Sequence, residues 1–400
     1  MSDAASSLLS AQAVRSHCAQ IMRLAERDAA PHFQWHPERL PQAAAYVADT
    51  IRQRYPDLKV PYHSRWRHFE AGGIDRWRAL AEAVPMDAAE RARVRIDLVI
   101  PSVLLDAGAG PDWHYDDTAS GMRLARSEGL GVASLALFAS GALSADAGQP
   151  LRADAAALSR FDAAALAAAF QAGADNPLVG LEGRAGLLRR LGEVIAGAPD
   201  IFGTPARLGN LYDTIAARAD NGRIQAGAVL TLLLHALGPV WPGRLAVDGV
   251  NLGDCWRHPG TDDGLLPFHK LTQWLTYSLL EPLEEAGLEV TGLDQLTGLP
   301  EYRNGGLLLD FGIITPRDAS FTSRLLAVDE PAVVEWRALT VIALDRMAEA
   351  VRAELGLTAA QFPLARILEG GTWAAGRRIA AERRPGGAPP VRMASDGTVF

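Results

Sequence analysis

Residues 95–117, Arg-Ile-Asp-Leu-Val-Ile-Pro-Ser-Val-Leu-Leu-Asp-Ala-Gly-Ala-Gly-Pro-Asp-Trp-His-Tyr-Asp-Asp, join a long apolar run to a turn dense in aromatic and acidic side chains. Upstream, Asp87 followed by Glu90 is a capping-box pattern, which predicts a helix from about residue 88 to Leu105. Asp106 then falls in the last turn, where unpaired carbonyl groups already carry partial negative charge. Because a carboxylate there breaks a local rule, we expect either a functional acid or an ion pair with an arginine.

Helical periodicity dominates the rest of the chain. One apolar face predicts a helix over residues 10–28 and consists of Val14, Cys18, Ile21, Met22 and Ala25. Further helices are expected over 42–54, 119–139, 153–172, 184–196, 223–238, 266–287, 330–355 and 359–383. Residues 306–314 are the best strand candidate. The expected fold class is mainly α, as one large helical domain with a few short strands.

No stretch is rich enough in Gly, Pro and Ser to separate domains cleanly. We expect a catalytic helical domain over residues 1–383, and 175–222 is where an internal division would fall. Arg384-Pro-Gly-Gly-Ala-Pro-Pro predicts a linker, so 384–400 reads as a linker and C-terminal tail.

Composition and charge exclude several classes of protein. Lys and Arg number 39 against 47 Asp and Glu, for a net charge of −8, which argues against a nucleic-acid partner. No apolar run reaches the roughly 20 residues needed to span a bilayer, and the N-terminus lacks a signal-peptide pattern. With only Cys18 and Cys255, neither a disulfide framework nor a thiolate metal cluster is expected. These features favour a cytoplasmic enzyme with no membrane partner.

Motifs for common cofactors and nucleophiles are missing. Gly108 and Gly110 follow a predicted helix rather than a strand, so they do not predict a nucleotide loop. Gly-x-Ser-x-Gly and His-Glu-x-x-His are both absent. We therefore expect no cofactor and no bound metal.

Acids, arginines and aromatics recur together in five short clusters: His63-Ser-Arg-Trp-Arg67, Asp112-Trp-His-Tyr-Asp-Asp117, Asp254-Cys-Trp-Arg-His258, Glu301-Tyr-Arg303 and Glu335-Trp-Arg337. Trp and Tyr offer flat walls to a sugar or base, while Arg binds carboxylates or phosphates with two hydrogen bonds. Each cluster alone is explained more simply by an ion pair beside a core aromatic. Five of them together favour a polar pocket.

Four long motifs carry a resemblance to a known family: Arg95–Gly110, Gly253–Pro259, Leu296–Gly306 and Glu369-Gly-Gly-Thr-Trp-Ala-Ala-Gly-Arg377. Together with Ser395-Asp-Gly-Thr-Val-Phe400, they closely resemble the uracil-catabolism protein 4 family over almost the whole chain. The resemblance implies a role in a pyrimidine-degrading route that passes through a ribosylurea-type compound.

A more distant similarity concerns the chemistry. Glu301-Tyr-Arg303 and the later Glu335-Trp-Arg-Ala338 resemble paired motifs of queuosine salvage proteins, which are mainly helical N-ribosyl hydrolases. This similarity implies a DNA-glycosylase-like fold. This chain has Glu301 where those proteins have an Asp, which lengthens the side chain by one methylene.

The combined hypothesis is hydrolysis of an N-glycosidic bond in a ribosylated urea or uracil-derived compound. It leaves open whether that compound carries a 5′-phosphate. Asp106 and Glu301 are the predicted catalytic acids, because a carboxylate stabilises an oxocarbenium-like transition state or activates water. The predicted substrate-binding residues are Arg65, Trp66, Trp113, Tyr115, Asp254, Trp256, Arg257, Tyr302, Arg303, Glu335 and Arg337.

Two other readings stay open. One is metal-dependent cleavage of the ring or urea, with ligands among His63, His68, His258 and His269. The other is a non-catalytic ligand-binding or scaffolding subunit of the same pathway. The oligomeric state is also open, with a homo-oligomer among the options.

Overall fold

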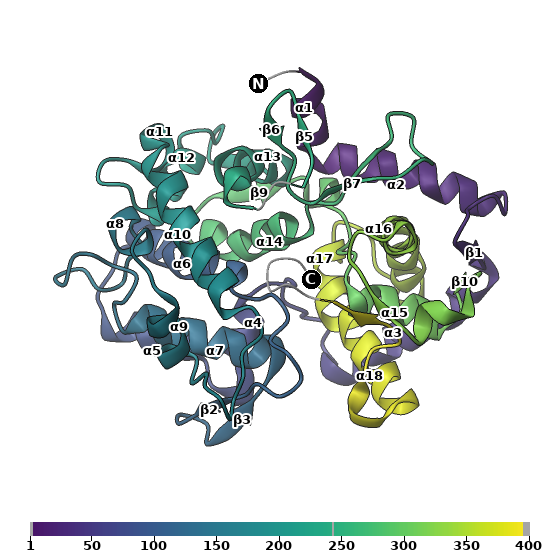
Figure 1. Cartoon of the computed structure of the whole chain (residues 1–400), viewed down its shortest axis with the longest axis horizontal. Helices are drawn as coiled ribbons and strands as arrows, with labels where there is room; N and C mark the ends of the chain where they lie inside the picture. The colour runs from purple at the N-terminus through teal and green to yellow at the C-terminus, as the bar shows by residue number, and fades with distance from the viewer. Residues whose placement is uncertain (1–2, 242–243, 395–400) are drawn as a thin grey trace. The chain divides into compact units, whose positions relative to one another are not determined.

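The computed structural model describes residues 3–241 and 244–394 (Figure 1). Its backbone contacts cluster into two compact units. Unit 1 comprises Met1–His63, Gly243–Gln273 and Gly292–Ala394, and unit 2 comprises Ser64–Pro242, Trp274–Thr291 and Ser395–Phe400. Residues 395–400 of the predicted tail lie outside the described residues.

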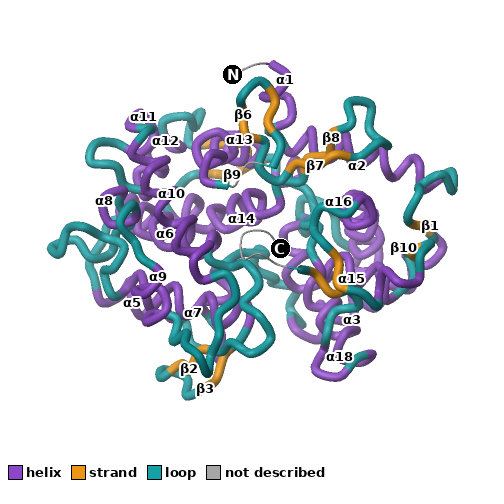
Figure 2. The backbone as a smooth tube through the Cα atoms, in the orientation of Figure 1, coloured by secondary structure: helices purple, strands orange, loops and turns teal. Residues whose placement is uncertain are grey.

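The prediction of a mainly helical fold is confirmed, and the strands occur as short pairs (Figure 2). The helices of unit 1 are α1 (Asp3–Leu8), α2 (Ala11–Glu26), α3 (Leu40–Arg54), α15 (Tyr302–Asp310), α16 (Pro331–Leu355), α17 (Leu364–Arg366) and α18 (Trp373–Arg383). Those of unit 2 are α4 (Trp66–Phe69), α5 (Arg76–Ala83), α6 (Ala88–Leu104), α7 (Arg126–Ala139), α8 (Ala155–Leu158), α9 (Ala163–Ala169), α10 (Leu181–Ala196), α11 (Pro199–Phe202), α12 (Leu211–Ala216) and α13 (Ala226–Leu237). Helix α14 (Lys270–Glu285) begins in unit 1 and continues in unit 2.

Each strand pairs with one partner. In unit 1 the antiparallel pairs are β1 (Phe33–Trp35) with β10 (Ile314–Pro316), β5 (Ala246–Val247) with β6 (Val250–Asn251), and β7 (Cys255–Arg257) with β8 (Leu265–Pro267). The parallel pair of unit 1 is β11 (Leu325–Leu326) with β12 (Arg392–Met393). Unit 2 has β2 (Tyr115–Asp117) antiparallel to β3 (Met122–Leu124), and β4 (Arg223–Gln225) parallel to β9 (Glu289–Thr291).

Helix α16 forms the centre of unit 1. It packs against α2, α3 and α15, and its own residues from Val333 to Leu344 are all buried. Helix α2 presents the apolar face that its periodicity predicts, since Val14, Cys18 and Ile21 are fully buried. Pro331 stands in the first turn of α16, where its missing N–H costs nothing, and Gly356 ends the helix in the left-handed conformation. Pro331 and Gly356 therefore mark the two ends of this helix.

A π-helical segment, Ile367–Thr372, lies between α17 and α18. Its fourth and fifth residues are glycines, and other parts of the chain approach both of them closely. A Cβ on Gly370 would lie 2.8 Å from Val60, and one on Gly371 would lie 2.9 Å from Val47 on α3. Such wide turns occur frequently at functional sites.

The predicted helix start after Asp87 is confirmed, because Oδ1 of Asp87 accepts the Glu90 amide at 2.7 Å. The helix, α6, ends at Leu104, so Asp106 lies just beyond it rather than in its last turn. The prediction of a strand over 306–314 is wrong. Residues up to Asp310 belong to α15, and the strand β10 begins only at Ile314. A short apolar run suits a buried helix as well as a strand, and here the Glu301 cap decides for the helix.

Within residues 3–241 and 244–394, no helix combines the length and the apolar character needed to cross a bilayer.

Candidate functional site

The Glu-Trp-Arg motif on α16 holds three separate segments of unit 1. Oε1 of Glu335 accepts the backbone amides of His32 and Phe33, at 3.0 and 2.9 Å. The indole of Trp336 donates to the Gly305 carbonyl on α15 at 3.3 Å. Successive residues of one helix therefore fix the entry to β1 and the body of α15.

Arg337 completes this arrangement. Its guanidinium binds Asp254 with two hydrogen bonds of 2.8 Å and donates to the Pro300 carbonyl at 3.4 Å. Asp254 also accepts from the Trp256 indole at 2.7 Å and from the Lys270 amide at 3.0 Å. Burial raises the pKa of this carboxyl, but the Arg337 charge and the hydrogen bonds outweigh it and hold the pKa well below its usual range. Asp254 is therefore ionised and fully engaged.

Glu301 is the N-cap of α15. Its carboxylate accepts the backbone amides of Arg303 and Asn304, both at 2.6 Å, and the residue is 7% exposed. This arrangement satisfies two of the amides that a helix start leaves unpaired and places the negative charge at the positive end of the helix. The predicted acid is thus held in one orientation by the fold.

The two residues after Glu301 begin the helix. Arg303 is buried, donates to the Gly387 carbonyl at 3.0 Å and stacks over the Tyr302 ring at 5.1 Å. Tyr302 is half-buried. The acid, the aromatic ring and the guanidinium of this motif therefore lie together at the start of α15, as expected from their adjacency.

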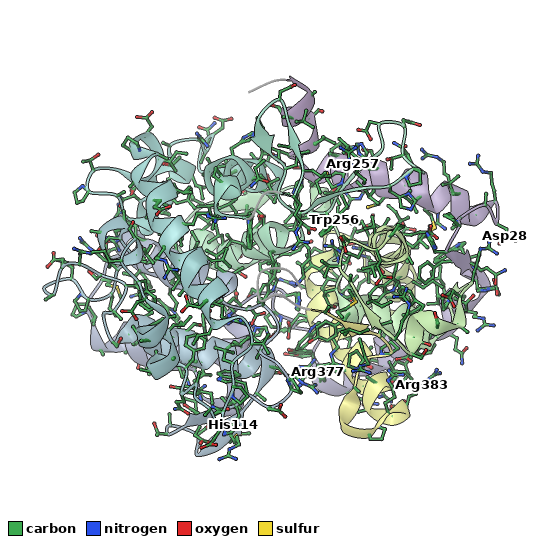
Figure 3. All side chains as sticks on the ribbon, viewed as in Figure 1. Asp28, His114, Trp256, Arg257, Arg377 and Arg383 are labelled. Carbon is green, nitrogen blue, oxygen red and sulfur yellow. The ribbon has the colours of Figure 1, made fainter. Side chains whose placement is uncertain are left out.

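Helices α15 and α18 pack closely at one glycine. A Cβ on Gly376 would lie 2.4 Å from the Arg303 carbonyl oxygen. Arg377, the next residue of α18 and labelled in Figure 3, has its guanidinium carbon 4.9 Å from the centre of the Trp373 ring. The Leu296–Gly306 and Glu369–Arg377 motifs, some seventy residues apart in the sequence, thereby meet in unit 1.

The same region contains an acid–base pair that the predicted site does not include. Nδ1 of His63 lies 2.8 Å from Oε2 of Glu369 in the π-helical segment, and both side chains are about 6% exposed. The ring of His63 also packs against Trp373, 5.7 Å away. Sequence alone offered two separate signals, the His63 cluster and the glycines after Glu369, but not their pairing.

In unit 2, Asp106 forms the ion pair that its position suggested. Nη1 of Arg65 donates to Oδ1 at 2.5 Å, and the Ser127 hydroxyl donates to Oδ2 at 3.2 Å. Arg65 is fully buried, which lowers the pKa of its guanidinium, and it also donates to Ser102 at 2.7 Å. The two predicted acids therefore belong to different units, each with its own arginine or helix partner.

The predicted aromatic residues of unit 2 differ in burial. Trp66 and Trp113 are core side chains whose indole N–H groups donate to the carbonyls of Ser278 and Phe170. Tyr115 is half-buried, and burial raises its pKa. In unit 1, Trp256 is buried on β7 beneath Arg244, whose guanidinium lies 4.7 Å from the ring, while Arg257 is exposed (Figure 3).

The histidines of the metal reading do not converge among the described residues, which contain no group of three or more His, Cys, Asp or Glu arranged to hold a metal ion. His258 accepts the Gly260 amide through Nδ1 and faces Glu335 at 3.5 Å through Nε2. The ring of His269 contacts the Leu8 carbonyl at 2.9 Å, and burial lowers its pKa. His68 belongs to unit 2, whereas His63, His258 and His269 belong to unit 1.

Comparison with known proteins defines the class. Residues 7–400 match the family described as protein of unknown function (DUF1688), and the chain belongs to this family. It is 38% identical over 402 residues to Protein urg3 of Schizosaccharomyces pombe, covering 98% of each chain. It is 37% identical over 407 residues to Uracil catabolism protein 4 of Lachancea kluyveri, covering 92% of each chain. The family predicted from the four motifs is confirmed.

Proposed function

We propose that the protein is an enzyme of pyrimidine breakdown that hydrolyses the N-glycosidic bond of a ribosylated urea or uracil-derived compound, with or without a 5′-phosphate. The name of the Lachancea kluyveri relative, Uracil catabolism protein 4, supports the pathway. The observation that carries the reaction is the Glu301-Tyr302-Arg303 set at the start of α15, where the carboxylate is fixed by two backbone amides.

Glycosidic bond cleavage builds positive charge on the sugar ring, and a fixed carboxylate stabilises that charge without having to reorganise. Each oxygen of Glu301 uses one lone pair for its backbone bond and keeps another. The helix cap therefore orients Glu301 and leaves it able to interact with the sugar.

Arg303 and Tyr302 supply binding in this proposal. The guanidinium suits a phosphate or a sugar hydroxyl, and the half-buried ring of Tyr302 offers a flat wall. Arg337, oriented by Asp254, holds the Pro300 carbonyl just before Glu301, so these two residues support the segment without contacting the sugar. Glu335 instead holds the backbone at His32 and Phe33. The other predicted acid, Asp106, belongs to unit 2 and is paired there with Arg65.

The test is sugar release by the purified protein. Ribosylurea, its 5′-phosphate, uridine and uridine monophosphate are each supplied, and free ribose or ribose phosphate is measured. We expect turnover of a urea-type compound, and loss of turnover in Glu301→Gln. No release from any of the four compounds would overturn the proposal.

A further inference from the structure

Arg65 of unit 2 is fully buried, and its Nη2 has no hydrogen-bond partner among residues 3–241 and 244–394. Nη1 donates to Oδ1 of Asp106 at 2.5 Å and to the Ser127 carbonyl at 3.3 Å. Nε donates to the Ser102 hydroxyl at 2.7 Å. Buried polar groups in native proteins are almost always paired with protein, water or a ligand. The two N–H groups of Nη2 are therefore donors that still need an acceptor.

The neighbouring serine hydroxyls are already committed. Ser134 donates to the Gly131 carbonyl at 2.8 Å, which uses its one hydroxyl hydrogen. In the contact of 2.6 Å between Ser134 and Ser102, the donor is then Ser102. Ser102 in turn accepts from Nε of Arg65. The hydrogen bonds run in one direction from Arg65 to Gly131, and Nη2 stays outside them.

Asp106 offers acceptors beside this donor. Oδ1 accepts from Arg65, and Oδ2 accepts from the Ser127 hydroxyl at 3.2 Å, so each oxygen keeps a further lone pair. The Asp106 side chain is 11% exposed, whereas that of Arg65 is fully buried. The pair thus consists of a carboxylate that solvent reaches and a guanidinium that solvent does not reach.

Packing holds both members of the pair in place. Arg184 donates to three backbone carbonyls around Asp106, those of Leu105 at 3.2 Å, Ala107, and Gly108 at 3.1 Å. Helix α7, which supplies Ser127, approaches α4 at Gly131, where a Cβ would lie 2.7 Å from Cβ of His68. The start of α4, the turn after α6 and the first turn of α7 therefore form one arrangement within unit 2.

We propose that the Arg65–Asp106 pair binds the amide or ureide edge of an uncharged ligand. The carbonyl oxygen of that edge accepts from Nη2 of Arg65, and the adjacent N–H donates to Asp106. The nitrogen and oxygen of such an edge share one carbon, as do the two terminal nitrogens of the guanidinium, so a planar contact with two hydrogen bonds is matched in spacing.

The charges of the pair favour an uncharged ligand. Arg65 and Asp106 neutralise each other, so a phosphate would be repelled by the carboxylate and a cation by the guanidinium. A neutral amide meets neither penalty and supplies both the donor and the acceptor. The inference assigns a binding site in unit 2 and does not rest on the proposed glycosidase function.

The first experiment compares two ligands of the same shape on the wild-type protein. The ligand 2-pyridone carries an N–H beside its carbonyl, and 2-pyranone has a ring oxygen in place of that N–H. We expect 2-pyridone to bind about tenfold more tightly or better, because the ring oxygen of 2-pyranone faces the carboxylate with no hydrogen to donate. Ligand-observed NMR titration measures both dissociation constants. Equal affinities, or no saturable binding of either ligand, would overturn the proposal and leave water as the partner of Nη2.

The second experiment assigns the binding to this pair. Asp106→Asn removes the charge that receives the N–H, so the Kd of 2-pyridone should rise about tenfold or more. Asp97→Asn is the matched control, because it breaks another buried ion pair of unit 2, in which Nε of Arg207 donates to Asp97 at 2.7 Å. The Kd should not change in this control. An unchanged Kd in Asp106→Asn, or an equal rise in both variants, would overturn the site.

The two experiments are independent of catalysis and of each other. Neither ligand contains a glycosidic bond, so a failure to release sugar would count against the proposed function and not against this site. The comparison of 2-pyridone with 2-pyranone needs no variant. It therefore decides the proposal even where Asp106→Asn does not fold.

Discussion

Arg337 donates one hydrogen bond to each carboxylate oxygen of Asp254, with both N–O distances at 2.8 Å. The pair joins α16 to the residue just before strand β7, and the same guanidinium donates to the Pro300 carbonyl just before Glu301. A buried bidentate ion pair of this kind sets the relative orientation of the two side chains and also neutralises their charges. It is the contact by which the helix positions the proposed catalytic segment.

Asp254→Asn should lower the free energy of unfolding by about 3–5 kcal/mol at neutral pH, because Arg337 is left as an uncompensated buried charge. The folded pKa of Asp254 is depressed, so its stabilisation is complete above the ordinary Asp value of about 3.9 and is lost as the pH falls through the folded value. Urea unfolding measures the free energy of unfolding of the wild-type protein and of Asp254→Asn at each pH. The difference between them should be constant above about pH 5 and should become smaller in stronger acid. A difference that widens in acid would contradict this assignment.

Glu301 has two roles that substitutions can separate. Glu301→Ala should cost about 0.5–2 kcal/mol of stability, since it removes the cap of α15, and should abolish sugar release. Glu301→Gln keeps an oxygen for one backbone amide and removes the charge, so activity should fall with a smaller loss of stability. Asp87→Ala is the matched control, because Asp87 caps α6 in the same way through the Glu90 amide. Asp87→Ala should lose about as much stability as Glu301→Ala and should retain the activity. Full activity in Glu301→Gln would exclude an electrostatic role.

Gly376→Ala should destabilise the protein by about 1–3 kcal/mol, because the added methyl group would overlap the Arg303 carbonyl. The helices α15 and α18 would separate, so the activity should fall with the stability. Gly186→Ala on α10 is the control, since the nearest atom to a Cβ there is Nη2 of Arg189, 3.8 Å away. That substitution should be neutral or stabilising by up to about 1 kcal/mol. Thermal unfolding of the two variants decides between steric overlap and a general effect of replacing glycine.

The Arg65–Asp106 pair lends itself to a double-mutant cycle. Asp106→Ala alone should cost about 3–5 kcal/mol, because it leaves the fully buried guanidinium of Arg65 without its acid. Adding Arg65→Met should recover part of that loss, since the unpaired charge is then gone. Denaturant unfolding of the single and double variants measures the coupling. Strictly additive losses would show that the two side chains do not stabilise each other.

The local features of this protein follow from its sequence. Periodicity alone predicts the buried face of α2, and Asp87 with Glu90 predicts the start of α6, because helical spacing and capping depend on residues within a few positions of one another. The four long motifs likewise identify the family. The prediction of a strand over 306–314 fails because the apolar spacing of a short buried run does not distinguish the two structures, whereas the Glu301 cap selects the helix.

Tertiary structure decides how the motifs meet. His63 and Glu369 are more than three hundred residues apart, and no local pattern pairs them. Glu369 belongs to the π-helical segment, whose glycines let that segment approach Val60 and α3. Tertiary structure also determines which charged groups are already engaged, as Asp254 is with Arg337 and Asp106 with Arg65. Sequence specifies which groups are present, but only long-range packing determines which of them hold the fold and which remain available for chemistry.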